Sequence, residues 1–388
     1  MTAAMRDRLR GCLFGLAVGD ALGAAVEFKA PGTFAPVTGF RAGGPHRLDP
    51  GEWTDDTSLA VALGDSIVSV GWDLNDQAKR YLDWYENGRY SVTGKCFDIG
   101  NQTRAALAQF KRTGDAYSSG SSAERSSGNG SIMRLAPVPV ALAGLYPDQV
   151  KLLADFAEQS SVPTHPSAPC RSACRYFGVV LAALAAGEPR EEVLSPTWPV
   201  LDDLGPLHPT VDAVARGSFR AKQPPAIRGG GYVVESLEAA LWAFAGAQDF
   251  REAVLRAVNL GDDADTTGAV CGQLAGACWG ESGIPADWRT GLARTDLLEA
   301  ALGGTLRSGA MAAGALPSDP SARADRRQEG PSPTPVPAVS PPAGSYWVVT
   351  GRFLAGCFPG SLDPVEQERK YGAFADLGIT TFINLTVV

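Results

Sequence analysis

The residues best suited to chemistry lie in the acidic segment Gly261–Thr267, which reads Gly-Asp-Asp-Ala-Asp-Thr-Thr. Carboxylates this close repel one another and resist burial, so folded proteins usually bury such a cluster only where cations neutralise it. The segment that follows, Gly268–Trp279, consists mostly of small apolar residues and is typical of a closely packed, buried helix. This setting favours a metal site over the alternative, a solvated acidic turn.

A second acidic cluster, Trp53–Thr57, stands far upstream and also precedes an apolar helical segment. Asp and Thr commonly begin helices, so each cluster taken alone could serve only as a helix cap. Two such clusters together indicate a site divided between distant parts of the chain. If the fold brings them together, they supply a cage of oxygen ligands: Thr54, Asp55, Asp56, Asp263, Asp265 and Thr266. Ligands of this kind suit Mg²⁺ or Mn²⁺ rather than Zn²⁺.

Several separated motifs, taken together, resemble those of the ADP-ribosylglycohydrolase family, in particular the bacterial branch that includes the dinitrogenase reductase activating glycohydrolase. The resemblance covers about residues 5 to 303 and follows the family's motif order. The motifs are Gly11–Gly23 with Glu27, Trp53–Thr57, Phe97–Asn101, Gly128–Arg134, Thr164–Pro166, Gly230–Glu235 and Gly261–Thr266.

The resemblance implies roles for individual residues. It places two Mg²⁺ or Mn²⁺ ions on the oxygen cage, about 3.5 to 4 Å apart as in other two-metal sites. Asp98 is implied beside the substrate ribose, as the leading candidate to activate water, and Glu27 at the pocket entrance is the second candidate. His165 is implied beside the phosphate or ribose, and Tyr232 against the adenine.

The glycine-rich turn of Gly128, Asn129, Gly130 and Ser131 is implied to hold the pyrophosphate of ADP-ribose. Backbone N–H groups of such a turn can bind phosphate oxygens. The turn lacks the lysine of a nucleotide-hydrolase phosphate loop and does not match the dinucleotide-binding fingerprint, which argues against a Rossmann site.

Each of these residues also has a purely structural interpretation. Asp98 could cap a helix over residues 102–111, and Glu27 could be an exposed carboxylate at a helix end. A single histidine before proline, such as His165, is more often structural, and an aromatic residue at a helix start, such as Tyr232, usually packs in the core. The loop over residues 29–52, rich in Gly and Pro, could form part of the pocket rim.

The function that the resemblance implies is hydrolysis of an N-glycosidic bond between ADP-ribose and a protein side chain, with arginine as the expected side chain. Carboxylates near the ribose would stabilise its positive charge as the guanidine leaves, and we expect no covalent nucleophile. Two alternatives stay open. One is a hydrolase of another linkage, such as O-acetyl-ADP-ribose or ADP-ribosyl-serine. The other is a catalytically silent ADP-ribose-binding module.

Composition limits the partners and the compartment. A formal net charge of −8 disfavours binding to nucleic acid or to anionic membranes, both of which need basic surfaces. The segment Gly11–Val26 is shorter than the ~20 apolar residues of a membrane span and contains Asp20. Seven cysteines without a Cys-x-x-Cys pair, and no secretory signal, predict reduced thiols in a cytoplasmic protein.

The pattern of the chain predicts an all-α fold with the metal site among the helices, because no alternating strand pattern occurs before residue 340. Glycines at 11, 15, 19 and 23 share one helical face, where another helix can approach closely. We predict a catalytic domain over residues 1–303 and a disordered, proline-rich linker over 304–344. Residues 345–388 resemble the start of a tyrosine or dual-specificity phosphatase-like α/β domain without its His-Cys-x5-Arg loop, so no phosphatase activity is expected.

Overall fold

The computed structural model describes residues 1–308, 345–349 and 353–356. The chain divides into two compact units, Met1–Pro320 and Ser321–Val388. In the described part of the first unit, regular structure is helical apart from two isolated bridges, Gly43 with Leu48 and Gly128 with Tyr232. The predicted all-α fold is therefore confirmed.

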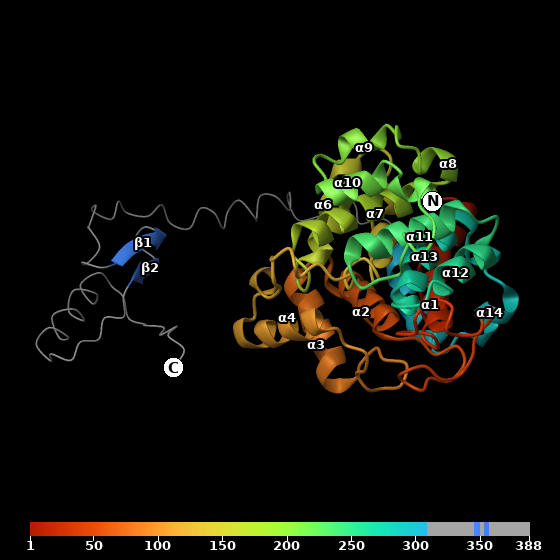
Figure 1. The fold of residues 1–388 in the computed structure, drawn as a ribbon, viewed down its shortest axis with the longest axis horizontal. Coiled ribbons are helices and arrows are strands. Elements are labelled where there is room, and N and C mark those ends of the chain that lie inside the picture. The colour runs from red at the N-terminus through yellow and green to blue at the C-terminus, as the bar shows by residue number, and fades with distance from the viewer. Residues whose placement is uncertain (309–344, 350–352, 357–388) are drawn as a thin grey trace, which may run out of the picture. The chain divides into compact units, whose positions relative to one another are not determined.

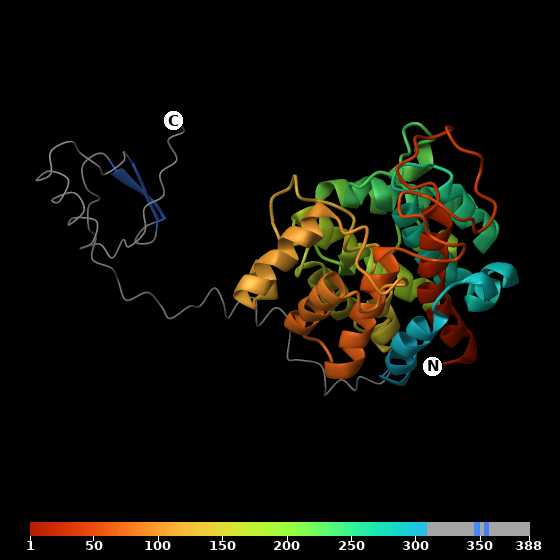
Figure 2. The ribbon, with the colours of Figure 1, turned by 90° about the horizontal axis from the view of Figure 1, so that it is seen from below.

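The helices vary in length, and the longest form the interior of the first unit (Figures 1 and 2). They are α1 Ala3–Gly23, α2 Asp55–Val70, α3 Leu74–Asn87, α4 Asn101–Thr113, α5 Pro137–Ala141, α6 Val150–Ser161, α7 Ala168–Ala186, α8 Arg190–Val193, α9 Val200–Asp203, α10 Pro209–Ala215, α11 Val233–Ala245, α12 Phe250–Val258, α13 Ala264–Trp279, α14 Ala286–Gly291 and α15 Thr295–Ser308. Short 3₁₀ helices span Ala116–Ser118, Ala143–Leu145, Ser218–Ala221 and Glu281–Gly283.

Helices α1 and α13 form the central pair, with α7, α11 and α12 packed against α13 (Figure 1). Glycines on the two helices face each other along their whole contact. A Cβ atom at Gly15 would lie 2.2 Å from the carbonyl oxygen of Gly272, and one at Gly272 would lie 2.0 Å from the oxygen of Gly15. The predicted close approach of another helix to the glycine face of α1 is confirmed, because any larger residue at these positions would meet backbone.

None of the helices over the described residues is long and apolar enough to cross a membrane. The apolar side chains of α1, such as Leu13, Phe14 and Leu16, are instead buried in the core of the first unit. This burial accounts for the apolar run in the sequence around Asp20.

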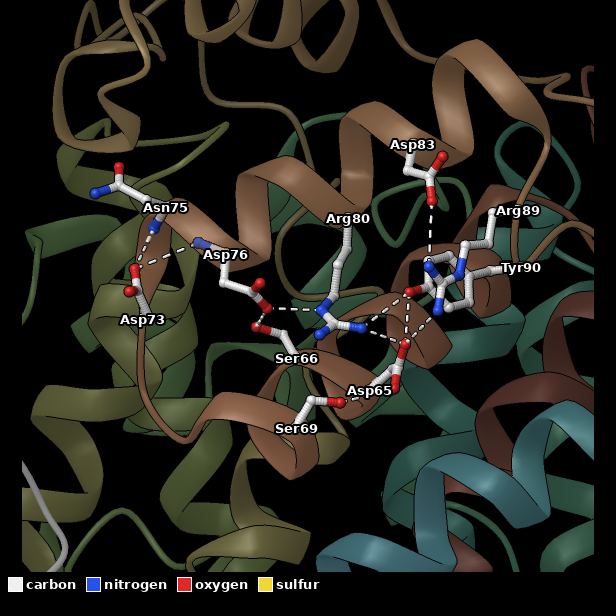
Figure 3. A network of polar contacts seen from close by, with 10 residues as sticks. All are labelled: Asp65, Ser66, Ser69, Asp73, Asn75, Asp76, Arg80, Asp83, Arg89 and Tyr90. Carbon is white, nitrogen blue, oxygen red and sulfur yellow. Dashed lines mark hydrogen bonds and ion pairs between the residues drawn. The ribbon is translucent and has the colours of Figure 1, made fainter.

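A polar network joins α2 to α3 and to the segment that follows α3 (Figure 3). Asp65 of α2 accepts a hydrogen bond from the Tyr90 hydroxyl at 2.6 Å and forms an ion pair with Arg80 of α3. Arg80 Nε also donates to Asp76 at 2.6 Å. The network fixes the beginning of the connection that carries Asp98, since Tyr90 lies at its start.

In the second unit, the described residues form a two-stranded antiparallel ribbon of β1 Ser345–Val349 and β2 Phe353–Gly356, with Tyr346 opposite Ala355. Residues 309–344 of the linker predicted over 304–344, and residues 350–352 and 357–388 of the segment predicted to be phosphatase-like, lie outside the described residues. Helix α15 continues to Ser308, past the end at 303 that the sequence predicted for the first domain.

Candidate active site

Asp20 connects the central helix pair to the first acidic cluster. From the buried face of α1 it accepts hydrogen bonds from the backbone N–H groups of Thr54 at 2.9 Å and Thr57 at 3.1 Å, and from the Thr57 hydroxyl at 2.6 Å. Burial raises the pKa of Asp20 to about 6, although these hydrogen bonds oppose the rise. Sequence reasoning did not assign Asp20 to the site; the available signal was a single carboxylate in an otherwise apolar helix.

The two acidic clusters lie in contact. The Thr54 hydroxyl donates to Asp265 Oδ2 at 3.3 Å, across 211 positions of sequence, and the Thr266 hydroxyl donates to Asp56 Oδ1 at 3.3 Å. The packing explains this meeting, because α13 carries the second cluster at its start, α1 packs on α13, and Asp20 of α1 holds the start of α2. The fold therefore brings the two halves of the predicted oxygen cage into contact.

Helix capping does not account for the two clusters. Thr54 and Asp263 occupy the N-cap positions of α2 and α13, yet neither side chain forms a capping hydrogen bond. Asp55 and Asp56 follow in the first turn of α2 and are both buried. Side-chain oxygens of both clusters are thus available to a ligand instead of to the N–H groups of a helix start.

The buried carboxylates repel one another and are incompletely hydrogen-bonded. Burial raises the pKa values of Asp55, Asp56 and Asp265 well above their ordinary range, and repulsion from neighbouring carboxylates raises them further. Among the described residues, no group donates a hydrogen bond to Asp56 Oδ2 or Asp265 Oδ1. Burying such oxygens without a partner is costly.

A hard divalent cation would satisfy these oxygens. Glu27, Asp263 and Asp265 each offer one ligand atom, and these atoms all lie within 4.8 Å of one another. These three ligand atoms are carboxylate oxygens, and Thr54 and Thr266 add hydroxyl oxygens beside them. Mg²⁺ and Mn²⁺ prefer oxygen ligands of this type. The residues present therefore fit a metal site.

A cavity of about 630 Å³ opens over the clusters. Most of the residues that the sequence singled out line it: Glu27, Asp55, Asp98, Gly128, Asn129, Gly130, His165, Asp263, Asp265 and Thr266. Thr54, Asp56 and Ser131 are buried but are not among its lining residues. Tyr232 also lies outside the lining; its backbone pairs with Gly128, and the residue is 37% exposed, so it is not a core residue.

The glycine-rich turn is held on several sides. Gly128 N–H donates to Gln102 Oε1 at 2.9 Å, and Asn129 Nδ2 donates to Asp263 Oδ2 at 2.7 Å, which ties the turn to the second acidic cluster. The buried Arg134 donates to the Gly130 carbonyl at 2.8 Å. Sequence reasoning did not identify Gln102 or Arg134 as supports, because nothing local marks their long-range contacts.

His165 lines the cavity and also packs against the glycine-rich turn. Its position is compatible with the substrate-binding role and with the structural role considered from the sequence. It is almost fully buried, and a Cβ atom on Gly130 would lie 2.6 Å from its Cε1 atom. Its Nδ1 atom lies 2.8 Å from the Thr164 hydroxyl. Burial and the nearby Arg134 lower the pKa of His165 to about 3, so its ring is neutral at physiological pH.

Asp98 and Glu27 lie together at the cavity wall, and His46 lies close to both. His46 Nε2 is 3.1 Å from Asp98 Oδ1 and 3.3 Å from Glu27 Oε2. Burial and repulsion from neighbouring carboxylates raise the pKa of Asp98 to about 7 and that of Glu27 to about 9. Glu27 is only 4% exposed, so it is not a solvated helix end.

The capping interpretation of Asp98 is wrong, because the N-cap of α4 is Gly100. Asp98 instead adopts φ +58°, a left-handed conformation that costs energy for a residue other than glycine and often occurs at functional sites. Sequence reasoning missed His46; its signal was only its place in the Gly- and Pro-rich loop at residues 29–52.

Thiol chemistry is disfavoured at this site. All six cysteines of the described residues are free. Burial raises the pKa of Cys96 to about 11 and that of Cys170 to about 11, so these thiols stay protonated and weakly nucleophilic at neutral pH.

Comparison with known proteins gives consistent matches. Residues 1–315 match the model of a protein family described as ADP-ribosylglycohydrolase. The chain is 38% identical over 287 residues to the ADP-ribosylarginine hydrolase Tri1 of Serratia proteamaculans (strain 568), covering 73% of this chain and 74% of that protein. It is 30% identical over 289 residues to the ADP-ribosyl-dinitrogen reductase glycohydrolase of Rhodospirillum rubrum, covering 73% of this chain and 90% of that protein.

A solved structure described as an ADP-ribosylglycohydrolase-related protein complex shares the fold. It matches with a TM-score of 0.69 and 40% sequence identity, over 79% of this chain and 100% of that chain. The family match ends at residue 315, and the comparisons give no support to the phosphatase-like interpretation of residues 345–388.

Proposed function

The chain belongs to the ADP-ribosylglycohydrolase family, and we propose that it hydrolyses the N-glycosidic bond that joins ADP-ribose to arginine side chains of modified proteins. The observation that carries this proposal is the contact between the two acidic clusters, Thr54 with Asp265 and Thr266 with Asp56. It gathers buried carboxylates with unsatisfied oxygens at the wall of a cavity large enough for a nucleotide-sized ligand.

The oxygen cage would hold two Mg²⁺ or Mn²⁺ ions through the residues singled out from the sequence: Thr54, Asp55, Asp56, Asp263, Asp265 and Thr266. When bound, the ions would orient the ribose hydroxyls and make a water molecule more acidic. The chain's own contribution is to hold these oxygens in place, through Asp20 on one side and Asn129 on the other.

Asp98 and Glu27 would divide the proton transfers between them. Asp98, at the cavity wall beside His46, would accept a proton from the attacking water, and Glu27, close to the same histidine, would carry one. The water oxygen bonds to the ribose carbon as the bond from that carbon to the guanidine nitrogen breaks. The nitrogen gains a proton, and the products are ADP-ribose and unmodified arginine.

The remaining substrate contacts are proposed at the cavity wall, and at Tyr232 outside its lining, whose backbone pairs with Gly128. The turn of Gly128 to Ser131 would bind the pyrophosphate, with His165 packed behind it, and Tyr232 would lie against the adenine. Support comes from the lining of the cavity by Gly128 and Asn129 and from the rigid hold on the turn by Gln102.

We further infer that residues 1–303 act as the catalytic domain, extended to Ser308 by the end of α15, and that the protein works in the cytoplasm. The location is supported by the free thiols of the described cysteines, which are typical of a reducing compartment. The proposed partner is an ADP-ribosylated protein, with no role for nucleic acid or a membrane.

Release of ADP-ribose tests the proposal. The full chain is incubated with arginine-ADP-ribosylated protein in Mg²⁺, in Mn²⁺ and in chelator, and we expect release only with a divalent cation. Asp263→Ala should abolish turnover, whereas the control Asp287→Ala, at a carboxylate 68% exposed on α14, should not change it. An unchanged rate in Asp263→Ala would remove that residue from the site.

The same assay separates the alternatives. Faster release from ADP-ribosyl-serine peptides or O-acetyl-ADP-ribose than from the arginine substrate would assign the other linkage. Binding of ADP-ribose without release from any substrate would identify a silent module.

A further inference from the structure

A buried guanidinium without a carboxylate partner lies behind the glycine-rich turn. Arg134 is 1% exposed. Its N–H groups donate to the Gly130 carbonyl at 2.8 Å, the Ser160 carbonyl at 3.4 Å and the Thr164 hydroxyl at 2.7 Å. The guanidinium also lies over the ring of Tyr81, 4.5 Å from its centroid. No carboxylate of the described residues pairs with it, and a charge buried in this way is costly, which suggests a role beyond packing.

The hydroxyl of Thr164 connects this guanidinium to His165. Thr164 Oγ1 lies 2.8 Å from His165 Nδ1. A guanidinium can only donate, so Arg134 occupies a lone pair of the hydroxyl oxygen. Among the described residues, the hydroxyl hydrogen then has no acceptor other than Nδ1. Because the ring of His165 is neutral and Nδ1 accepts, its single proton must be on Nε2.

The Nε2 atom of His165 reaches the cavity past two glycines. It lies 3.5 Å from the point where a Cβ atom would stand on Gly128, and 3.0 Å from that point on Gly130. Side chains at these positions would cover or displace the ring, whereas glycines leave it uncovered. His165 and both glycines line the cavity, and no hydrogen bond among the described residues engages Nε2. The Nε2–H group is therefore left to bind a ligand.

The rest of the cavity is poorly suited to an anion. Glu27, Asp98 and Asp263 are among its lining residues, and carboxylates repel a pyrophosphate. None of the described residues that line it is a lysine or an arginine. Apart from bound cations, attraction for a phosphate must therefore come from hydrogen-bond donors at the wall and from positive charge behind it. Arg134 supplies such a charge, because it donates to the Gly130 carbonyl from behind the turn.

We propose that Arg134 and Thr164 are positioning residues, which hold His165 as a neutral Nε2–H donor to a phosphate oxygen of ADP-ribose. This inference rests on the function proposed above, which puts the pyrophosphate at the turn. The hydrogen bonds run from the guanidinium to the hydroxyl and from the hydroxyl to Nδ1, and they fix both the proton and the orientation of the ring. The arrangement acts on binding, and no proton is transferred along it.

Nitrogen NMR of the histidine rings in the wild-type chain determines the tautomer directly. The sequence contains three histidines, so the signals of His165 are those that disappear in His165→Gln. At neutral pH and without ligand, we expect its proton on Nε2 and an Nδ1 resonance typical of a hydrogen-bond acceptor. A proton on Nδ1 would overturn the proposal. Because this measurement uses the unmodified protein, it decides the question even if a variant fails to fold.

Substitution of Thr164 tests the effect on binding. Thr164→Val removes the hydroxyl at nearly constant volume, so Nδ1 loses its partner. We expect the dissociation constant of ADP-ribose, measured by calorimetry in Mg²⁺, to rise about ten-fold, the effect of weakening one hydrogen bond to a charged group. The dissociation constant of adenosine, which has no phosphate, should not change. Thr164→Ser keeps the hydroxyl and should bind ADP-ribose as the wild type does.

His208 offers a matched control. Its Nδ1 atom also lies 2.8 Å from a threonine hydroxyl, that of Thr210. Thr210 is exposed and is not among the residues that line the cavity. Thr210→Val should therefore leave the dissociation constants of ADP-ribose and of adenosine unchanged.

Two further results would overturn the positioning role. One is a Thr164→Val protein that binds ADP-ribose as tightly as the wild type. The other is an equal weakening of ADP-ribose and adenosine, which would indicate a general distortion of the cavity. Failure of the proposed function is a different observation, namely wild-type protein that binds ADP-ribose but releases none from any substrate.

Discussion

Replacing Gly19 with alanine tests the packing on which the whole site depends. A Cβ atom at Gly19 would lie 2.0 Å from the carbonyl oxygen and 2.4 Å from the carbonyl carbon of Gly268. Both are backbone atoms, so α1 and α13 must move apart by about 1 Å to accept the methyl group in a closely packed core. Overpacking costs about 1–3 kcal/mol, and alanine returns about 1 kcal/mol of helix propensity. We expect an overpacking cost at the upper end of that range, about 3 kcal/mol, because backbone rather than a side chain must shift, and therefore a net loss of about 2 kcal/mol.

The same displacement should weaken the cation site. Asp20 follows Gly19 directly and holds the start of α2 through Thr54, whose hydroxyl contacts Asp265 of α13. Separation of the two helices therefore pulls the acidic clusters apart. We expect the Mg²⁺ concentration that gives half-maximal activity to rise along with the loss of stability.

Urea unfolding followed by circular dichroism, with and without Mg²⁺, measures both effects. The control is Gly64→Ala, an identical change inside α2, where the new Cβ atom would lie 3.1 Å from the Ala301 side chain instead of from backbone. We expect Gly64→Ala to stay within about 0.5 kcal/mol of the wild type, because propensity and crowding nearly cancel. A Gly19→Ala protein as stable as the wild type, with unchanged Mg²⁺ dependence, would refute the reasoning.

Three further predictions concern the site and its support. Asp98→Asn should lower kcat by about 10²- to 10⁴-fold, the usual contribution of a general base, without altering cation-induced stabilisation; a normal rate would exclude Asp98 as the base. Mg²⁺ at about one hundred times its dissociation constant should raise the free energy of unfolding by about 2.7 kcal/mol, an effect that Asp265→Asn should reduce in the same urea titration. Burial lowers the pKa of His165 to about 3, so the unfolded chain protonates this imidazole more readily than the folded chain does. The neutral His165 therefore makes its whole contribution to folding stability above pH 6.5, and this contribution is lost as pH falls toward 3. The loss between pH 7.5 and pH 5 should be about 2 kcal/mol, and urea unfolding of His165→Gln should lack that part of the slope.

Residue types and their local spacing in the sequence predicted much of the site's chemistry. Oxygen-bearing side chains in adjacent positions, as in Asp55 and Asp56, define ligand chemistry whatever the fold. Glycines four residues apart occupy one helical face, so the close approach of another helix to α1 was predictable from the sequence. These properties depend only on near neighbours in the chain.

Other features were decided by tertiary structure. The capping interpretation of Thr54 and Asp263 could be rejected only once their hydrogen bonds were known, because both do occupy N-cap positions. The part played by His46 depends on how a long loop folds back onto Glu27 and Asp98, which no local pattern specifies.

The sequence by itself determined which atoms could bind a cation and which helix faces could pack. Only the tertiary structure decided that Thr54 meets Asp265 across 211 positions, and that Asp98, Glu27 and His46 lie together at the cavity wall. The physical reason is that helix periodicity and ligand type follow from short-range geometry. Contact between distant segments instead depends on the summed packing of the core, here on two glycine faces that bring α1 and α13 together.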